Sequence, residues 1–382
     1  ATGLPVLTVP SFSELRDGTA RIERVRAIEP EDLLGREPVQ LDERGIAGLI
    51  SGKTILVTGA GGSIGSELCR QIALYGPAKV VLYELSEFAL YQIEQQLSES
   101  HPHVLLVRLM GDVKNLAHLR ATCGEHRPHV VFHAAAFKHV PLMEEENAWA
   151  ALQNNTLGTW NAATAAADSG AERFVLISTD KAVNPTNVMG ATKRAAEMVL
   201  SHIATQGHAT RFVAVRFGNV LGSSGSVIPK FKEQIARGGP VTVTHPDITR
   251  YFMTIPEAAR LVMQAAALAA GGEVYVLDMG EPVRIVDLAR DMIRLSGHRD
   301  DEIGIVFSGL RPGEKLYEEL LADADETLPS AHRLLRIAKL QEQLRVDLPA
   351  LLGDITPPAV SGASAAAVKH WLSTVVHEYR AQ

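Results

Sequence analysis

A run of reactive side chains follows an apolar stretch near the middle of the chain. Thr179, Asp180 and Lys181 follow Phe174–Ile177 after one serine, and the length and apolar content of that stretch predict a strand buried on both faces. A hydroxyl, a carboxyl and an amine can orient a substrate and move protons to and from it. Because ligands of open parallel sheets bind beyond the carboxyl ends of the strands, this run is the candidate catalytic site. The alternative is that Asp180 and Lys181 form an exposed ion pair at a strand end.

A glycine-rich turn is a second candidate site. It joins the apolar run Ile55–Thr58 to a helical pattern, and its glycines recur every third residue, as in a tight turn that approaches a pyrophosphate. The N–H groups at the start of the helix, together with the helix dipole, can hold the phosphate charge. A purely structural turn is the alternative. The candidate contacts in this turn are Gly59, Gly62, Ser63, Ile64 and Gly65.

Two features favour NAD over NADP as the dinucleotide. Glu84 ends the second apolar run, about twenty residues after the turn, where a carboxylate can bind both adenosine ribose hydroxyls and would repel a 2′-phosphate. Residues 85–90 contain no Arg or Lys. The other interpretation of Glu84 is a solvated side chain at a strand end. Further cofactor contacts are expected after the third and fourth strands, at Asp112, Val113, Ala134, Ala135 and Ala136.

The elements that must position these residues alternate regularly from Lys53 onward. Short apolar runs alternate with amphipathic helical patterns, which indicates a Rossmann-type, doubly wound parallel α/β sheet with strands buried on both faces. After about Phe217 the sequence becomes rich in Gly, Ser and Pro, which favours a smaller C-terminal substrate lobe. The predicted strands are Ile55–Thr58, Val80–Tyr83, Val104–Leu109, Val130–His133, Phe174–Ile177, Phe212–Val215 and Val274–Leu277.

These patterns divide the chain into four parts. The boundaries follow changes in periodicity and in the content of Gly and Pro. Residues 1–50 are predicted as an N-terminal arm packed on the main domain, and residues 51–217 as the NAD-binding Rossmann domain. Residues 218–330 are mainly the substrate-binding lobe, with some segments that return to the sheet, and residues 331–382 are a C-terminal helical extension.

The composition excludes several classes of function. A formal net charge of −7 supplies no basic face for a nucleic acid. Cys69 and Cys123 lie in apolar helical contexts without metal-ligand spacing, so we expect two buried thiols, with neither a disulfide nor a metal site. No stretch resembles a signal peptide or a membrane span, and we expect a cytoplasmic location.

The motifs together resemble a known group of enzymes. The glycine turn, His133–Ala136, Ser178–Lys181 and Arg311–Lys315 are similar to the extended short-chain dehydrogenase/reductase group. Over residues 50–330 the chain resembles the UDP-N-acetylglucosamine 4,6-dehydratases of bacterial surface-polysaccharide and glycoprotein biosynthesis, most specifically in Ser178–Glu197. The resemblance implies a hydro-lyase with tightly bound NAD that acts on a UDP-sugar for surface polysaccharide or lipopolysaccharide. It also implies a homo-oligomer, a dimer or larger.

Some of the resembled dehydratases carry membrane-spanning helices ahead of this domain. Because the chain begins at Ala1 rather than at Met, we expect it to be the soluble catalytic part of such a protein. A missing N-terminal segment would then hold it at the cytoplasmic face of the inner membrane.

The sequence departs from the wider group at one position. Most members carry Tyr-x-x-x-Lys on the helix after the fifth strand, and the matching residues here are Met189 and Lys193. Their spacing places both on one helix face, where Lys193 can bind the nicotinamide ribose but a thioether cannot shuttle a proton. A subset of the dehydratases resembles this sequence at the methionine too. Met189 then belongs to the catalytic site or only fills core space.

The resemblance implies a mechanism in three steps. Hydride leaves sugar C4 for NAD, water is eliminated across C5 and C6, and hydride returns to C6. We assign Lys181 as the base at C5, Asp180 as the acid at C6 and Thr179 as the hydroxyl that bonds O4. A neutral lysine requires a depressed pKa, which we expect from a dry site close to Lys193 and to the positive ring of the cofactor.

Substrate contacts are predicted in two places. Lys138 and His139 follow the fourth strand, beside the nicotinamide and the sugar, and both a direct and a structural role stay open for the histidine. Asn219 resembles the position that bonds the sugar diphosphate in the family. In the second lobe, cationic side chains suit a diphosphate and an acid could bond the uridine ribose. These candidates are Lys230, Arg250, Arg311 and Glu314, with Glu318 an alternative to Glu314.

Other functions stay open at this point. A UDP-sugar 4-epimerase would be expected to keep the tyrosine that Met189 replaces. A C5-inverting dehydratase would differ only in the face of reprotonation, which the sequence does not show. An NAD-sensing binding protein would have no need for Thr179–Lys181 together with Lys193. The preference for UDP-N-acetylglucosamine over other UDP-linked sugars rests on the resemblance alone.

Overall fold

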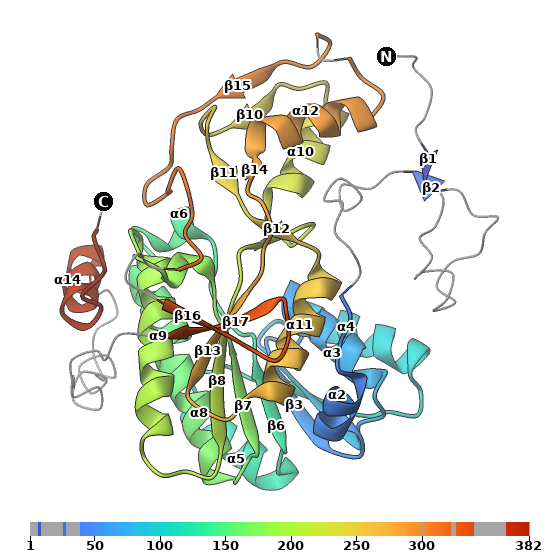
Figure 1. Ribbon diagram of the computed structural model, residues 1–382, viewed down its shortest axis with the longest axis vertical. Coiled ribbons are helices and arrows are strands. Elements are labelled where there is room, and N and C mark those ends of the chain that lie inside the picture. The colour runs from blue at the N-terminus through green and yellow to red at the C-terminus, as the bar shows by residue number, and fades with distance from the viewer. Residues whose placement is uncertain are drawn as a thin grey trace.

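A nine-stranded sheet forms the centre of the computed structural model, which describes residues 7–8, 26–27, 39–299, 301–321, 326–339 and 364–381 (Figure 1). Its strand order is β16-β17-β13-β8-β7-β6-β3-β4-β5. All neighbours from β13 to β5 pair in parallel, which confirms the predicted parallel sheet. These strands are β3 (Thr54–Thr58), β4 (Lys79–Glu84), β5 (Leu105–Met110), β6 (Val130–His133), β7 (Arg173–Ile177), β8 (Arg211–Arg216) and β13 (Glu273–Leu277).

The chain builds this sheet outward from β3 in both directions. β4 and β5 lie on one side of β3, while β6, β7, β8 and β13 follow on the other side. Sheets of this kind bind ligands in the crevice where the strand order reverses, here between β3 and β6. The glycine turn follows β3 and the segment Ala134–Ala136 follows β6, so both candidate cofactor segments begin at this crevice.

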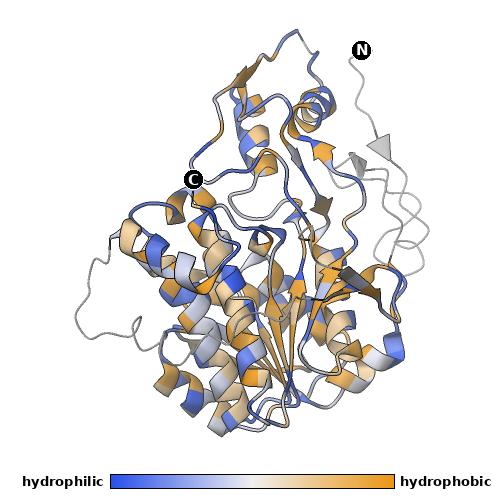
Figure 2. Ribbon diagram, turned by 60° about the vertical axis from the view of Figure 1, so that its left-hand side comes forward, coloured by the Kyte–Doolittle hydropathy of each residue, from blue (hydrophilic) through white to orange (hydrophobic). Residues whose placement is uncertain are grey.

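Helices cover both faces of the sheet. Successive residues of a strand point to opposite faces, so Leu56 packs into one apolar layer while Ile55 and Val57 pack into the other. Figure 2 shows hydrophobic residues concentrated on the strands between these helices. The first layer contains α5 (Leu116–His126), α8 (Gly158–Asp168) and α9 (Val188–Ala204), with α14 (Ala365–Val375) packed on α9. The second layer contains α2 (Glu43–Ile50), α3 (Ser63–Ala73), α4 (Glu87–Ser100) and α11 (Ile255–Leu268).

A smaller lobe stands over the carboxyl ends of the parallel strands, at the top of Figure 1. It has an apolar core of its own, in which Phe231 of α10 (Val227–Ala236) and Leu288 of α12 (Ile285–Leu295) are buried. Short two-stranded ladders complete this lobe. They pair β9 (Asn219–Val220) with β12 (Phe252–Met253), β10 (Val241–Val243) with β15 (Ile305–Phe307), and β11 (Thr249–Arg250) with β14 (Val283–Arg284).

The C-terminal part of the chain returns to the sheet, which was predicted for some segments of residues 218–330 but not for residues beyond 330. Residues 331–382 were expected to be helical, but β17 (Leu335–Lys339) pairs antiparallel with β13, and β16 (Glu326–Pro329) pairs with β17. Arg336 and Lys339 interrupt the apolar residues of β17, so a search for continuous apolar runs does not detect it.

Short elements connect these layers. β6 leads to α8 through α6 (Val140–Met143), α7 (Ala148–Ala151) and the π-helical turn Leu152–Leu157. In the N-terminal arm, α2 packs on α11, and the N–H of Asp42 donates to the Gln264 side chain over 2.7 Å. β1 (Leu7–Thr8) pairs antiparallel with β2 (Arg26–Ala27). The rest of residues 1–38 lies outside the described residues.

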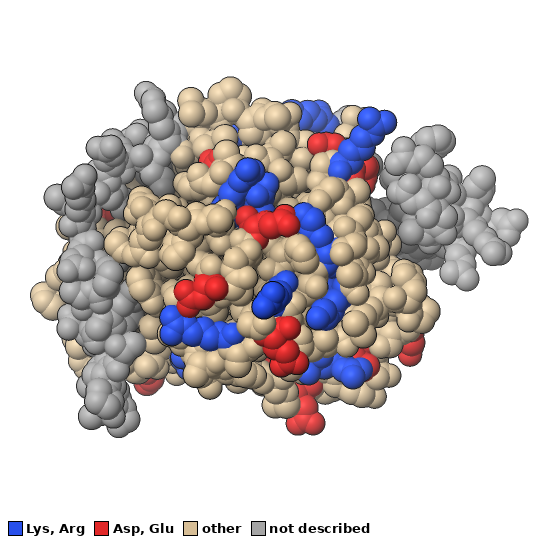
Figure 3. All heavy atoms as spheres, turned by 90° about the horizontal axis from the view of Figure 1, so that it is seen from below, with Lys and Arg blue, Asp and Glu red and all other residues tan. Residues whose placement is uncertain are grey.

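The cysteines, the acidic and basic side chains and the apolar helices bear on the expectations from composition. Cys69 and Cys123 are free and buried, which confirms the predicted thiols. Within the described ranges, no group of His, Cys, Asp and Glu side chains could hold a metal ion. No described helix combines the length and the apolar character that a bilayer crossing requires. On the face seen in Figure 3, Lys and Arg are interspersed with Asp and Glu.

Candidate active site

The glycine turn leaves no room for side chains at two of its positions. Gly59 has a left-handed φ of 64°, and a Cβ there would lie 2.7 Å from the Ala135 nitrogen. A Cβ on Gly65, in the first turn of α3, would overlap the carbonyl oxygen of Gly59. β3, β6 and α3 therefore meet through backbone alone, which presents the amino end of a helix to the crevice. This geometry fits the pyrophosphate of a dinucleotide.

Glu84, the last residue of β4, contacts the glycine turn. Its carboxylate accepts hydrogen bonds from the N–H groups of Gly61 over 3.0 Å and Ser86 over 2.9 Å. The acid therefore braces the turn. An ionised carboxylate has lone-pair sites beyond these two bonds, with which it can accept from ribose hydroxyls.

Asp112, Val113 and Ala135, also predicted to contact the cofactor, have different surroundings in the structure. Asp112 pairs with Lys114, whose Nζ lies 2.7 Å from the carboxylate. Val113 is buried, and a Cβ on Gly158 of α8 would lie 2.7 Å from one of its methyl groups. Val113 thus packs into the core through its side chain, while Ala135 lies against the glycine turn.

Thr179, Asp180 and Lys181 form one hydrogen-bonded cluster beyond β7. Asp180 is fully buried, and its Oδ1 accepts from the Thr179 hydroxyl (2.8 Å) and from the Lys181 ammonium (2.9 Å). Lys181 also donates to the Oδ1 of Asn219 over 3.0 Å. The N–H of Asp180 donates to the Phe217 carbonyl over 3.0 Å, which ties the segment after β7 to the segment after β8. The fold thus joins Asn219 to the catalytic run.

The predicted depression of the Lys181 pKa is wrong for this structure. Burial lowers the pKa of Lys181, but the carboxylates of Asp180 and Glu318 outweigh burial and hold that pKa above its ordinary value. Lys193 does have a depressed pKa, because burial lowers it to about 8. An opposite charge within a few ångströms favours the charged form of a side chain. The prediction considered the neighbouring cations and left out these acids.

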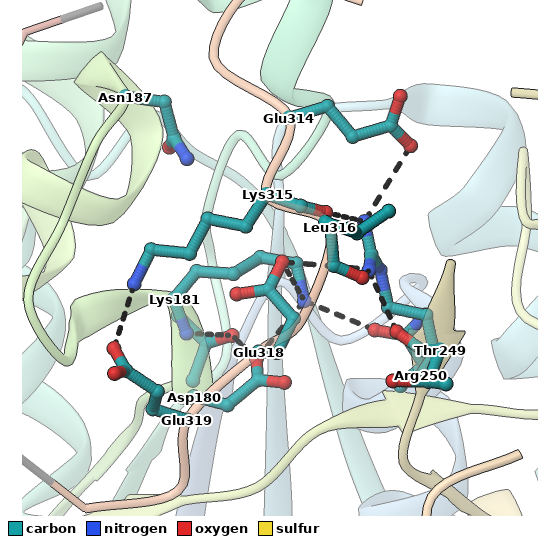
Figure 4. A network of polar contacts seen from close by, with 12 residues as sticks. Asp180, Lys181, Asn187, Thr249, Arg250, Glu314, Lys315, Leu316, Glu318 and Glu319 are labelled. Atoms are coloured by element: carbon teal, nitrogen blue, oxygen red, sulfur yellow. Dashed lines mark hydrogen bonds and ion pairs between the residues drawn. The ribbon is translucent and has the colours of Figure 1, made fainter. Parts of the chain in front are cut away.

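Glu318 and Arg250 complete the buried charges around Lys181 (Figure 4). The Oε1 of Glu318 lies 3.8 Å from both the Lys181 Nζ and the Arg250 Nε. Burial raises the pKa of Glu318, and the Lys181 charge opposes this shift. Arg250, predicted for the diphosphate, donates to the carbonyl oxygens of Lys315 (2.8 Å) and Leu316 (3.3 Å). Arg250 therefore holds the segment that contains Lys315 and Leu316, and this segment places Glu318 beside Lys181.

Lys138 and His139 approach the cluster from the loop after β6. Burial and the charge of Lys181 lower the pKa of Lys138. The imidazole of His139 packs so closely on Gly225 that a Cβ there would overlap the ring. Burial lowers the pKa of His139, and the charges of Lys138 and Arg311 lower it further. The loop after β6 therefore places Lys138 within reach of the Lys181 charge and His139 against Gly225 of the second lobe.

The remaining predicted substrate contacts lie in the second lobe. Arg311 is exposed and pairs with Glu314 over 3.0 Å, and Glu314 lies 3.5 Å from the Arg250 guanidinium. Through Arg250, this pair is linked to the catalytic cluster. Lys230 is exposed on α10, and the described contacts do not connect it to the other candidates.

A buried charge network beneath the cluster escaped the sequence analysis. Glu197 accepts hydrogen bonds from the Ser178 hydroxyl (2.6 Å), from Arg216 (2.8 and 2.7 Å) and from Arg194 (3.2 Å). All four side chains are buried. Because Ser178 directly precedes the catalytic run, this network holds the start of that run. One signal could have found it, since Glu197 lies one helical turn after Lys193.

Met189 and Lys193 are both buried on α9, with exposed fractions of 3% and 4%. Met189 belongs to the apolar layer on that face of the sheet, so its position is consistent with the core-filling interpretation. The helix approaches the catalytic run closely, because a Cβ on Gly190 would overlap the carbonyl oxygen of Lys181.

Known proteins are similar to this chain in sequence. A family model described as polysaccharide biosynthesis protein matches residues 55–339. The chain is 51% identical over 354 residues to the capsular polysaccharide biosynthesis protein CapD of Staphylococcus aureus, an alignment that covers 92% of this chain and 59% of CapD. It is 30% identical over 284 residues to a UDP-N-acetylglucosamine 4,6-dehydratase (inverting) of Campylobacter jejuni, covering 73% of this chain and 80% of the relative.

Solved structures show the same architecture. Pen from Bacillus thuringiensis matches with a TM-score of 0.68 and 32% identity, over 76% of this chain and 90% of Pen. DesIV, a dTDP-glucose 4,6-dehydratase from Streptomyces venezuelae, matches with a TM-score of 0.62 over 69% of this chain and 87% of DesIV; at 21% identity it shows the fold alone.

The sheet, the glycine turn and the catalytic run therefore define an extended short-chain dehydrogenase/reductase. Within that group, the chain belongs to the polysaccharide biosynthesis protein family. It spans less than two thirds of the length of CapD.

Proposed function

We propose that this chain dehydrates a UDP-N-acetyl-hexosamine, UDP-N-acetylglucosamine first of all, to a UDP-4-keto-6-deoxy sugar with tightly bound NAD. The observation that carries the proposal is the partly buried, hydrogen-bonded cluster of Thr179, Asp180 and Lys181 with Asn219. These side chains supply the hydroxyl, the acid and the base that the reaction needs. Relatives named for dehydration of this sugar and for capsular polysaccharide biosynthesis support a role in bacterial surface glycans.

The residues around the glycine turn fit NAD. The close backbone approach at Gly59 and Gly65 leaves space for the pyrophosphate, Glu84 would accept from the adenosine ribose, and Lys193 would bind the nicotinamide ribose. Bound NAD supplies the acceptor and the donor of the hydride. NAD occurs in solved proteins of the same fold, DesIV and a UDP-glucose 4-epimerase of Thermus thermophilus, which supports this choice.

The hydrogen bonds of the cluster define a path for each proton. Thr179 donates to Asp180, so the O4 proton can pass through the hydroxyl to the carboxylate when C4 is oxidised. Protonation of Asp180 removes the charge that holds the proton on Lys181, so the pKa of Lys181 falls. Lys181 then releases its proton to solvent, and the neutral amine takes the C5 proton while Asp180 gives its proton to the departing C6 hydroxyl as water. Lys181 returns its proton to C5 when hydride reaches C6.

Incubation with UDP-N-acetylglucosamine, followed by mass spectrometry, tests the proposed function. We expect a product lighter by one water, formed without added oxidant or reductant. Intact substrate would contradict the dehydratase and favour an NAD-sensing protein. An isomer of equal mass would favour a 4-epimerase, the activity for which a Rickettsia rickettsii relative of 31% identity is named. The C5 configuration of the product, from NMR coupling constants, distinguishes retention from inversion.

Replacement of Glu318 by glutamine is expected to shift the pH dependence of kcat. Ionised Glu318 raises the pKa of Lys181, so its removal lowers the pH at which Lys181 loses its proton. The rising limb of kcat against pH should therefore move to lower pH. The other charged groups that face Lys181 are Asp180 on its own turn and Arg250 and Lys138 from other elements, and none of these changes in this variant. Glu319→Gln, one residue further on and partly exposed, is the control and should leave the limb in place. A limb that stayed put or moved to higher pH would contradict this placement of Glu318.

Replacement of Glu84 by alanine is expected to weaken NAD binding. Hydrogen bonds to a charged group contribute about 1.5–3 kcal/mol each, so loss of the ribose contact should raise the Kd of NAD by about tenfold or more. Acid-released dinucleotide per chain measures retention. Glu99→Ala, at an exposed position of α4, provides the comparison. Equal NAD content in the two variants would remove Glu84 from the ribose site.

A further inference from the structure

The last described segment of the chain, residues 364–381, packs against α9; we call it the C-terminal clamp. It consists of α14 and a short tail, and it lies beside α9 at the edge of the molecule (Figure 1). It also lies outside residues 55–339, the part that matches the family model. Its side chains buried in the same apolar layer as α9 are Val368, Leu372, Val375, Val376 and Tyr379.

One ion pair joins α14 to the amino end of α9. The Lys369 Nζ lies 2.6 Å from the Oε1 of Glu144, and the Oε2 of Glu144 accepts a hydrogen bond from the Val188 N–H over 2.9 Å. Val188 is the first residue of α9, and Glu144 is only 1% exposed. The helix dipole favours a carboxylate at this end, and Lys369 supplies the cation that a buried carboxylate requires.

A second ion pair joins the tail to the middle of α9. The Oε1 of Glu378 lies 3.1 Å from the Nη2 of Arg194, and Arg194 belongs to the buried network that holds Ser178. Further along the tail, the N–H of Arg380 donates to the carbonyl of Pro185 over 3.0 Å. The clamp is therefore bonded to Arg194 in α9 and to Pro185, which follows the catalytic cluster.

Glu144 also supports the loop that carries Arg311. Asn187 caps α9 by accepting from the Gly190 N–H (2.8 Å), and its amide donates to the Gly313 carbonyl (3.0 Å). A Cβ on Gly313 would lie 3.2 Å from the Oε2 of Glu144, so this loop rests on the carboxylate. One buried acid thus connects the clamp, the start of α9 and the predicted substrate loop.

We propose that Lys369 and Glu378 are positioning residues, through which the C-terminal clamp holds α9 and the catalytic cluster in place against the sugar and NAD. The proposal rests on the function proposed above. Displacement of reacting groups by about 1 Å can cost up to 10²-fold in rate. The ion pairs of the clamp end on Glu144 and Arg194. The loop that carries Arg311 is held by Glu144 and Asn187, and both variants keep these two side chains. Loss of either pair should therefore lower kcat more than it changes KM.

Lys369→Met and Glu378→Gln in the full chain test this proposal against Lys53→Met. Lys53 is a matched control, because it pairs with Glu172 over 2.7 Å, has the same exposed fraction of 24% as Lys369, and lies at the amino end of the sheet. We expect kcat to fall about tenfold in both clamp variants, with KM within about twofold of the parent. Lys53→Met should keep parental kinetics, and Lys369→Arg, which retains the cation, should restore kcat.

Hydrogen exchange of the amides in residues 182–193 provides a readout that does not depend on turnover. Exchange should be faster in both clamp variants than in Lys53→Met. Unchanged exchange, or a fall in kcat matched by Lys53→Met, would overturn the proposal. If the parent released no water from UDP-N-acetylglucosamine, the proposed function would fail, whereas the exchange rates would still decide whether the clamp holds this segment. If Lys369→Met did not fold, Glu378→Gln would decide the outcome by the same measurements.

Discussion

Replacement of Lys181 by methionine is expected to stop the release of water from the sugar while the nucleotide still binds. Loss of a positioned acid–base group lowers a rate by about 10²–10⁴-fold. Lys181 bonds both Asp180 and Asn219, so its amine sits at the centre of the proposed proton path. Mass spectrometry of the product measures the rate, and calorimetry with UDP shows whether the nucleotide site survives.

Two further measurements make this prediction specific to the proton at C5. In D2O, the parent should place deuterium at C5, because Lys181 takes that proton and returns one that has exchanged with solvent. Lys181→Met should lose this incorporation, whereas Lys53→Met should retain both the rate and the label. A Lys181→Met chain that kept a tenth of the parental rate would contradict the assignment of the base.

Replacement of Glu197 by glutamine is expected to have the largest effect on stability. Its carboxylate is the shared partner of Arg216 and Arg194, and these three side chains are at most 5% exposed. Removal of one partner from a buried ion pair costs about 3–5 kcal/mol, because the remaining charge stays buried. Urea unfolding measures this difference. Glu172→Gln, which breaks the exposed pair with Lys53, should cost less than about 1 kcal/mol.

The same variant carries a pH signature. Burial raises the pKa of Glu197, but Arg216, Arg194 and the Ser178 hydroxyl outweigh burial and hold that pKa below its ordinary value. A carboxyl with a lowered pKa in the folded state stabilises the protein above its unfolded pKa and loses this contribution as pH falls through the folded value. The gap in unfolding free energy between the parent and Glu197→Gln should therefore narrow in acid. A gap that was constant or widened in acid would contradict the ionised state of Glu197.

The parts of the site that were predictable are those that a local pattern specifies. Gly59 and Gly65 could be found because a tight backbone approach tolerates only glycine, and the structure shows that approach directly. The apolar runs predicted the parallel strands, and their order placed Thr179–Lys181 at the carboxyl end of β7. β17 was missed because Arg336 and Lys339 interrupt its apolar residues, so it does not form a continuous apolar run. Its partner β13 lies far away in the chain, so the pairing cannot be recognised from neighbouring residues.

The sequence by itself determined the sheet, the glycine turn and the residue types of the catalytic run. Each of these features depends on residues that are neighbours in the chain, because a buried strand needs an apolar run and a tight turn needs glycine. Only the tertiary structure decided how these groups are charged and supported. The Lys181 pKa depends on Glu318, and Arg250 supports the segment that brings Glu318 there. Glu144 acquires its role from Lys369. Electrostatic interactions depend on distances between residues remote in sequence, and folding alone sets those distances.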